Sequence, residues 1–164
     1  KKFFYLLTFC VQSGIKWYKM VTMKKVFIGI SYLTLDKKGR IFLPQKFRFK
    51  KKYVLTYGID NCVAIYPYQE WLKTTKKIEN ISLKDKSYQR IFNRIFFAQA
   101  EIVELDNQGR LLIPKKFKDK YSLSNEVVLV GNRNKVELWS KEEWEKYYKN
   151  AEKILNQIKS QIEI

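Results

Sequence analysis

A ten-residue pattern occurs twice in this chain, and it constrains the fold more than any other feature. The first copy spans residues 35–44 and the second spans residues 105–114. Leu, Asp, Gly, Arg and Pro hold the same places in both copies, and a basic-aromatic segment follows each, at 46–48 and 116–118. The interval between the two copies is too long for a solenoid repeat. The pattern therefore predicts two copies of one small fold.

The shared positions are typical of a tight turn between antiparallel strands. The Asp can accept a hydrogen bond from a backbone N–H two residues on, and the Gly tolerates the positive φ that closes the loop. Such a loop commonly takes a type I turn with a glycine bulge. The Pro ends the return strand and suits the first position of a short helical turn. We therefore expect structural roles for Asp36, Gly39, Pro44, Asp106, Gly109 and Pro114.

Each copy continues with a second predicted hairpin, over residues 54–66 and 127–139. Both have a central turn rich in Gly, Asn and Asp, which favours hairpins. Trp71 and Trp144 follow at equivalent places, each at the start of a predicted helix. Residues 140–143 form a capping-box pattern before the second of these helices. The pattern therefore predicts that each repeat contains two hairpins separated by one helical turn and followed by a helix.

Two longer helices are predicted from apolar stripes at helical spacing. The first links the repeats, with Ser82 and Asp85 as its cap. We favour core packing for both stripes, but they are wide for a monomer, so contacts between subunits are the second interpretation. The stripes are Tyr88, Ile91, Phe92, Ile95 and Phe96 in the linking helix, and Trp144, Tyr147, Tyr148, Ala151, Ile154, Leu155 and Ile158 in the last.

The chain is strongly basic. Its 164 residues include 33 Lys and Arg against 16 Asp and Glu, which gives a formal net charge of +17. This excess favours a polyanionic partner such as DNA, RNA or a membrane surface. Richness in Lys, Ile, Phe, Tyr and Asn is also what AT-rich coding produces, so charge alone names no function. The arginine that each turn carries, Arg40 and Arg110, points more specifically to nucleic acid.

Residue usage argues against catalysis. The chain has no histidine, and Cys10 and Cys62 lie far apart, so neither zinc-ligand spacing nor a disulfide framework is present. The sequence also has no Gly-rich phosphate loop and no nucleophile elbow. We expect a protein that is not an enzyme, with no metal and no cofactor, in a reducing cytosol.

The N-terminal segment, 1–22, differs from the rest of the chain. Lys1 and Lys2 precede a short apolar run, which is the outline of a secretory signal. The run is too short to span a bilayer, and no Ala-x-Ala cleavage site follows it. Met20 and Met23 stand just before the first predicted strand. We expect translation to begin at Met23 and residues 1–22 to lie outside the fold.

Two copies of Asp-x-x-Gly-Arg-x-x-x-Pro, each followed by a basic-aromatic turn and a second hairpin, resemble the MraZ family. The resemblance extends from Met23 to about Ile158. It implies an α+β fold of two tandem SpoVT–AbrB-like modules, of the swapped-hairpin or double-split β-barrel type. The expected parts are a first module at 27–73, a linking helix at 82–97, a second module at 98–143 and a C-terminal amphipathic helix at 144–160.

The resemblance also implies a function. Proteins of that family are bacterial transcriptional regulators that assemble into rings and bind short repeated sequences upstream of the division and cell-wall gene cluster, which contains their own gene. We therefore expect double-stranded DNA and further copies of this chain as partners, no membrane, no small-molecule substrate, and a place in the cytoplasm at the nucleoid. The family's DNA-contacting arginine falls on Arg40, and the second copy places Arg110 likewise.

Neighbouring basic residues can extend the contact to phosphates. The first turn carries Lys37 and Lys38 where the second carries Asn107 and Gln108, so we hypothesise that the first module dominates phosphate contact. The DNA-binding residues expected from the sequence are Arg40, Arg110, Lys37, Lys38, Lys46, Arg48 and Lys116, with Lys50, Lys51, Lys52, Lys115 and Lys118 as further candidates.

Other interpretations stay open at the level of sequence. The two arginines could form only local ion pairs with Asp36 and Asp106, and the lysines could be a solvated face. An AbrB-like antitoxin would carry one module and a disordered tail. A ring-forming scaffold without DNA binding would need no paired turn arginines. An enzyme acting on nucleic acid would need a carboxylate cluster, whereas the acidic residues here are scattered or lie in turns.

Overall fold

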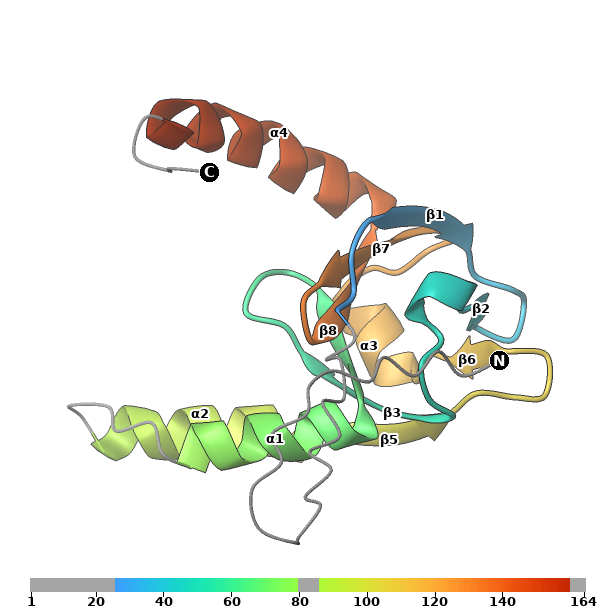
Figure 1. Cartoon of the computed structure of the whole chain (residues 1–164), viewed down its shortest axis with the longest axis horizontal. Helices are drawn as coiled ribbons and strands as arrows, with labels where there is room; N and C mark the ends of the chain where they lie inside the picture. The colour runs from blue at the N-terminus through green and yellow to red at the C-terminus, as the bar shows by residue number, and fades with distance from the viewer. Residues whose placement is uncertain (1–25, 80–85, 160–164) are drawn as a thin grey trace, which may run out of the picture.

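The computed structural model describes residues 26–79 and 86–159, which form one mixed α+β unit (Figure 1). The predicted α+β class is therefore confirmed. In chain order the elements are β1 (Ile30–Thr34), β2 (Arg40–Phe42), the 3₁₀ turn η1 (Gln45–Phe47), β3 (Lys52–Tyr57), β4 (Val63–Pro67), α1 (Tyr68–Glu79), α2 (Lys86–Ala98), β5 (Glu101–Glu104), β6 (Arg110–Leu112), α3 (Lys115–Lys120), β7 (Glu126–Asn132), β8 (Lys135–Ser140) and α4 (Lys141–Ile158).

The two repeats interleave in one antiparallel sheet. Its strand order is β1-β7-β8-β4-β3-β5, so the first strand of each repeat pairs with the second hairpin of the other. Ile30 lies opposite Val130, and Lys52 lies opposite Glu104. The remaining strands, β2 and β6, pair with each other in a two-stranded ribbon. Each of β1, β2, β5 and β6 therefore pairs with a strand of the other repeat.

The turn that carries the Arg thus joins strands that do not pair with each other. We expected a local hairpin, and the turn itself closes as one, because Asp36 N donates to Arg40 O at 2.9 Å. Beyond it the strands separate, β1 to the large sheet and β2 to the ribbon. Tertiary pairing prevails because β2 is only three residues long and cannot bury an apolar face alone. The second hairpins, β3–β4 and β7–β8, form as predicted.

One core lies between the large sheet and the ribbon. Ile41 and Leu111 point into it from β2 and β6 and have no exposed surface. Phe47 of η1 and Phe117 of α3 close it and are equally buried. Both repeats therefore contribute equivalent residues to a single core, whose other members include Leu43, Tyr53, Leu55, Val63, Ile65, Ile113, Val127, Leu129, Val136 and Leu138.

Helices cover the outer face of the sheet. The rings of Trp71 on α1 and Phe96 on α2 stack at 5.1 Å, over Val54 and Ala64 of the sheet. Farther along the same face, Trp139 of β8 packs against Trp144 of α4 with ring centroids 5.6 Å apart. Strands β3, β4, β7 and β8 are therefore buried on both faces, which explains their near-continuous apolar runs.

The core interpretation of the two helix stripes was wrong for most of their residues. Trp144 is buried and Phe96 packs against Trp71, but the other large side chains face solvent within the single chain. Beyond its first turns α4 projects away from the sheet (Figure 1). The exposed residues are Tyr88, Ile91, Phe92 and Ile95 on α2, and Tyr147, Tyr148, Ile154, Leu155 and Ile158 on α4.

Some sequence expectations fall outside the described residues. These are the extension 1–22, the start at Met23 and the cap at Ser82 and Asp85. The cap predicted at Ser140 is present, because its Oγ accepts a hydrogen bond from Glu143 N at 3.3 Å.

Candidate nucleic-acid interface

The two motif turns have the same hydrogen bonds. In the first, Asp36 Oδ1 accepts from the backbone N–H groups of Lys38 and Arg40, both at 2.9 Å. In the second, Asp106 Oδ1 accepts from Gln108 and Arg110 at the same distances. Gly39 and Gly109 adopt φ values of +75° and +80°, which L side chains rarely adopt. The Asp and Gly therefore shape the turn through the local bonds that their residue types allow.

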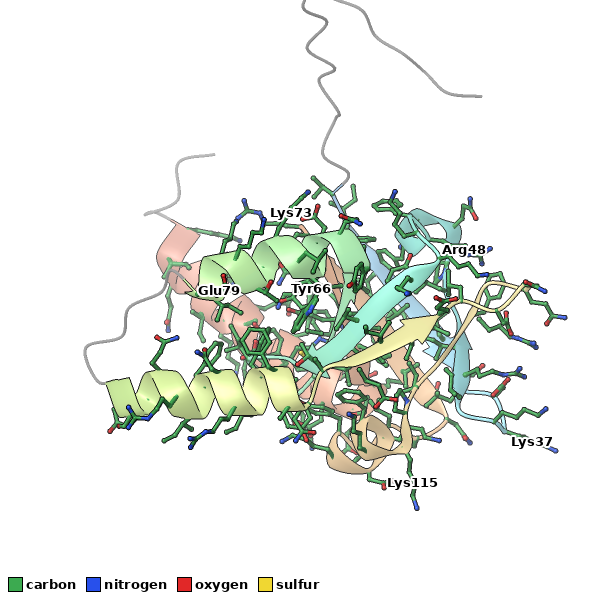
Figure 2. The ribbon with its side chains drawn as sticks, turned by 90° about the horizontal axis from the view of Figure 1, so that it is seen from below. Lys37, Arg48, Tyr66, Lys73, Glu79 and Lys115 are labelled. Carbon is green, nitrogen blue, oxygen red and sulfur yellow. The ribbon has the colours of Figure 1, made fainter. Side chains whose placement is uncertain are left out.

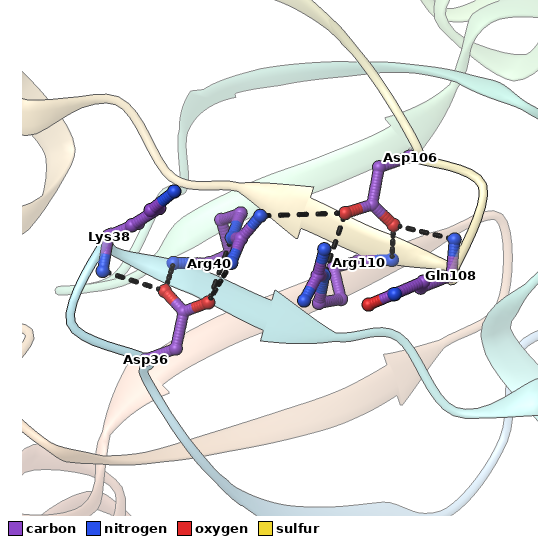
Figure 3. A network of polar contacts seen from close by, with 6 residues as sticks. All are labelled: Asp36, Lys38, Arg40, Asp106, Gln108 and Arg110. Carbon is purple, nitrogen blue, oxygen red and sulfur yellow. Dashed lines mark hydrogen bonds and ion pairs between the residues drawn. The ribbon is translucent and has the colours of Figure 1, made fainter.

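The same carboxylates bind the two arginines (Figure 3). Arg40 Nε donates to Asp36 Oδ2 at 2.8 Å, and its NH2 lies 2.7 Å from the same oxygen. Arg110 Nε donates to Asp106 Oδ2 at 2.7 Å. Arg40 NH1 also lies 3.7 Å from Asp106 Oδ2, so the network joins the two repeats. Each guanidinium is thereby restrained beside the ribbon.

These bonds favour the ionised carboxylates. Hydrogen bonds from the side chain and backbone of Arg40 lower the pKa of Asp36 from 3.8 to about 2. The backbone N–H of Arg110, followed by its side chain, lowers the pKa of Asp106 in the same way. Both aspartates are therefore charged at neutral pH, and each balances one arginine.

The arginines lie on the outward face of the β2–β6 ribbon. Arg40 is opposite Leu112 and Arg110 is opposite Phe42 in the antiparallel register, whereas the buried residues between them point inward. The side chains of Arg40 and Arg110 are 23% and 30% exposed. They are partly accessible, so a ligand can reach them without unfolding of the chain.

The lysines predicted to contact DNA differ in their contacts within the protein. Lys37 and Lys38 are exposed at the tip of the first turn, and Figure 2 shows Lys37 at the opposite end of the molecule from Glu79 on α1. Lys46 Nζ donates to Ile30 O at 2.7 Å, and Lys116 Nζ lies 2.9 Å from Glu101 Oε2. Lys46 and Lys116 therefore each bind a residue in the first strand of their own repeat.

Arg48 has a structural role that the sequence did not indicate. Its Nε and NH2 donate to Leu43 O at 3.3 and 2.8 Å, and its guanidinium occupies the place that a Cβ on Gly109 would take. Lys118 covers Gly39 in the equivalent way. The basic segment of each repeat thus packs on the turn of the other, which only interleaved repeats allow.

Two residues of the ribbon face were missed from the sequence. Phe42 and Leu112 follow the arginines at spacing two and are 55% and 50% exposed. The alternation of exposed and buried residues along β2 and β6 was the available signal, because a strand with one buried face exposes every second side chain.

Other kinds of site find no support in the described part of the chain. Over residues 26–79 and 86–159, no three His, Cys, Asp or Glu residues gather as they would to hold a metal ion. Burial raises the pKa of the Cys62 thiol to about 12, so this cysteine stays protonated and unreactive. Within those same ranges no helix has both the length and the apolar character that crossing a membrane requires.

The interleaved repeats and their paired turns define a tandem-repeat α+β protein with an arginine-bearing ribbon. Comparison with known proteins agrees with this class. The family model described as "MraZ protein, putative antitoxin-like" matches residues 26–94 and again residues 96–161. The chain therefore belongs to the MraZ family.

Curated relatives support the same assignment, and each of those named here is called "Transcriptional regulator MraZ". The protein of Natranaerobius thermophilus is 40% identical over 139 residues, which cover 84% of this chain and 96% of the relative. Those of Halothermothrix orenii and Desulforamulus reducens are 39% and 36% identical, with 84% of this chain and 97% of each relative covered.

Proposed function

We propose that this protein is a sequence-specific DNA-binding transcriptional regulator and not an enzyme. The observation that carries the proposal is the pair of partly exposed, carboxylate-restrained arginines on one ribbon face. Arginine offers a planar fork of donors that suits guanine O6 and N7 or phosphate oxygens. The name of the relatives and the net charge of +17 point in the same direction.

The proposed target is a set of short repeated elements upstream of the division and cell-wall gene cluster, including the protein's own gene. Gel-shift titration of the upstream duplex against a scrambled duplex of the same composition tests this. We expect clear preference for the upstream duplex. If six to ten phosphates are contacted, affinity falls by about 10³–10⁵ between 50 and 200 mM salt. Equal binding of both duplexes, or a flat salt dependence, would contradict the proposal.

Matched arginine variants locate the binding surface. Arg40→Ala removes a ribbon arginine, and Arg90→Ala removes one exposed arginine from α2. Both lose one positive charge, so nonspecific electrostatics change similarly. We expect loss of operator binding for Arg40→Ala and near-normal binding for Arg90→Ala. The reverse order would place the DNA on the helical side.

We further propose that the protein works as a homo-oligomer, a ring in which several ribbons engage repeated elements. The wide exposed stripes of α2 and α4 support this, because monomers rarely leave such apolar faces uncovered. Linking several modules raises their effective concentration on repeated DNA. Sedimentation analysis of the wild type and of Ile91→Glu and Ile154→Glu tests it. A wild type that is strictly monomeric and still binds one operator tightly would refute the ring.

An antitoxin-like role is the second candidate, because the matching family model is described as antitoxin-like. An AbrB-like antitoxin would combine one module with a disordered toxin-binding tail. Here two repeats share one sheet, which favours the regulator. A scaffold without DNA binding would also fit the apolar stripes, and absence of upstream DNA binding would favour it. As a regulator the protein would act at the nucleoid.

A further inference from the structure

The outward face of the β2–β6 ribbon carries two large apolar side chains that the proposed function has not used. Phe42 lies directly opposite Arg110, and Leu112 lies directly opposite Arg40. Residues opposite each other in an antiparallel pair share a face. Both apolar side chains are about half exposed, at 55% and 50%. The surface proposed to meet DNA is therefore a compact set of two arginines and two apolar groups.

The centre of this face is close to electrically neutral. Asp36 and Asp106 each bind the arginine of their own turn, at 2.8 and 2.7 Å, so two positive and two negative charges lie together. Further positive charge surrounds this centre, because Lys37 and Lys38 are exposed at the tip of the first turn and Arg48 and Lys118 cover Gly109 and Gly39. A neutral, partly apolar centre does not attract phosphates, whereas a basic rim does. The arrangement suits a ribbon that lies between two phosphate backbones.

The groove that fits such a ribbon is the major groove. It is about 12 Å wide and admits a two-stranded β-ribbon, whereas the minor groove is about 6 Å wide. The major groove is also where base pairs differ in an apolar feature, the C5 methyl group of thymine, which apolar side chains contact. Arginine suits guanine and an apolar side chain suits the thymine methyl group, so this face fits a DNA site in which guanines and thymines are neighbours.

The two repeats fix the apolar residue differently. The guanidinium of Arg48 lies 4.8 Å from the ring centroid of Phe42 and is itself held on Leu43 O at 2.8 Å. The Phe42 ring is therefore restrained on its strand. In the second repeat the basic residue at the corresponding place is Lys118, which covers Gly39. The ring of Phe42 thus has a bound guanidinium as a support.

We propose that Phe42 and Leu112 determine DNA sequence specificity by contacting thymine methyl groups in the major groove, beside Arg40 and Arg110. This inference rests on the proposed DNA-binding function. It adds an apolar, methyl-dependent component to recognition that hydrogen bonds and phosphate contacts do not supply.

Methyl removal from the DNA tests the proposal on the unmodified protein. The probes are the duplex upstream of the protein's own gene and the same duplex with deoxyuridine in place of thymidine. Burying one methyl group contributes enough for about a fourfold change in affinity. We expect the wild type to bind the deoxyuridine duplex about fourfold more weakly for each methyl contacted.

Variants then assign the methyl dependence to residues. In Phe42→Ala/Leu112→Ala the ratio of affinities for the two duplexes falls toward one. Leu112→Ala alone keeps the contact between Arg48 and Phe42. We expect this variant to lose part of the preference for the thymidine duplex. The control is Ile102→Ala, which removes an apolar side chain of similar exposure, 56%, from β5 of the large sheet and keeps the wild-type ratio.

The outcomes separate this inference from the proposed function. Equal binding of thymidine and deoxyuridine duplexes, with preference for the upstream sequence retained, overturns the methyl contact alone. An undiminished ratio in the double variant overturns it as well. No preference for the upstream duplex over a scrambled one rejects the proposed function itself, and the inference with it.

Discussion

The two repeats are most alike in their motif turns and begin to differ just after them. In both turns the Asp accepts from the backbone N–H of the arginine at 2.9 Å, and the arginine Nε donates to it at 2.8 Å in the first repeat and 2.7 Å in the second. The prolines that follow also agree, with φ of −57° at Pro44 and −56° at Pro114. Past the proline the first repeat forms a three-residue 3₁₀ turn and the second a six-residue α-helix.

The outer helices differ even more. Helix α1 stacks Trp71 on Phe96 of α2, whereas α4 packs only its first turns on the sheet and then projects (Figure 1). The turn is the same in both repeats because the Asp carboxylate of each turn accepts hydrogen bonds from backbone N–H groups of that turn. The outer helices differ because α1 packs against α2, whereas α4 packs only on the sheet. Each motif turn is therefore shaped by its own residues, whereas the side chain that packs over it comes from the other repeat.

Substitutions in the centre of the core test whether the two repeats depend on one shared core. Ile41 and Leu111 hold equivalent places, opposite each other in the ribbon, and both are fully buried. Ile41→Ala and Leu111→Ala should each lower the free energy of unfolding by about 2–5 kcal/mol. Chemical denaturation followed by fluorescence and circular dichroism should show one transition in both variants. Two transitions, with only one shifted, would mean that the repeats fold independently.

Arginine removal tests whether the repeats contribute equally to DNA binding. Each bidentate arginine contact with a base provides about 1–3 kcal/mol of discrimination. We expect Arg40→Ala to weaken upstream-duplex binding more than Arg110→Ala, because Lys37 and Lys38 add phosphate contacts only at the first turn. Fluorescence anisotropy titrations of both variants measure the two losses. A greater loss for Arg110→Ala would reverse the ranking.

Glycine replacement tests how each turn depends on the opposite repeat. Both glycines have positive φ, which costs an L residue about 1–2 kcal/mol. A Cβ on Gly39 meets the flexible end of Lys118, but a Cβ on Gly109 meets the Arg48 guanidinium, which is bound to Leu43 O. Thermal unfolding should therefore show a lower Tm for Gly109→Ala than for Gly39→Ala. Equal shifts would show that Arg48 moves aside freely.

Acid pH should lower the stability of the fold slightly, through protonation of Asp36 and Asp106. The pKa of Asp36 is lowered in the folded state from 3.8 to about 2, so its bonds stabilise the fold above the unfolded value. That contribution is lost as the pH falls from about 4 toward 2. Asp36→Asn should flatten the fall in stability over this range relative to the wild type, measured by Tm against pH. Asp106→Asn, at the matched place, should do the same; a steeper fall in either variant would contradict the argument.

Much of the fold could be predicted because the deciding residues act locally. The Asp, Gly and Pro of each repeat indicated the turn, and the Gly- and Asn-rich segments indicated the hairpins β3–β4 and β7–β8. Ser140 indicated a helix start. Each of these residues fixes its own backbone within a few positions, so no tertiary information was needed.

The candidate site was only half predictable. The two arginines follow from the motif, but their shared network, with Arg40 NH1 at 3.7 Å from Asp106, depends on the ribbon that brings the turns together. Arg48 and Lys116 look like DNA-binding residues in the sequence, yet they contact Leu43 O and Glu101. Which group a charged side chain contacts depends on the folded backbone around it and cannot be inferred from spacing along the chain.

A duplicated α+β unit with a basic, arginine-bearing turn in each half could be predicted from residue order alone, because turn chemistry depends on neighbouring residues and the repeat is visible in their spacing. The folded chain was needed to show that the halves exchange strands, that both turns meet on one ribbon and that Phe42 and Leu112 lie beside the arginines. A three-residue strand such as β2 is stabilised only by burial and by pairing with another strand. Its partner is selected by the shared core and lies in the other repeat, far away along the chain.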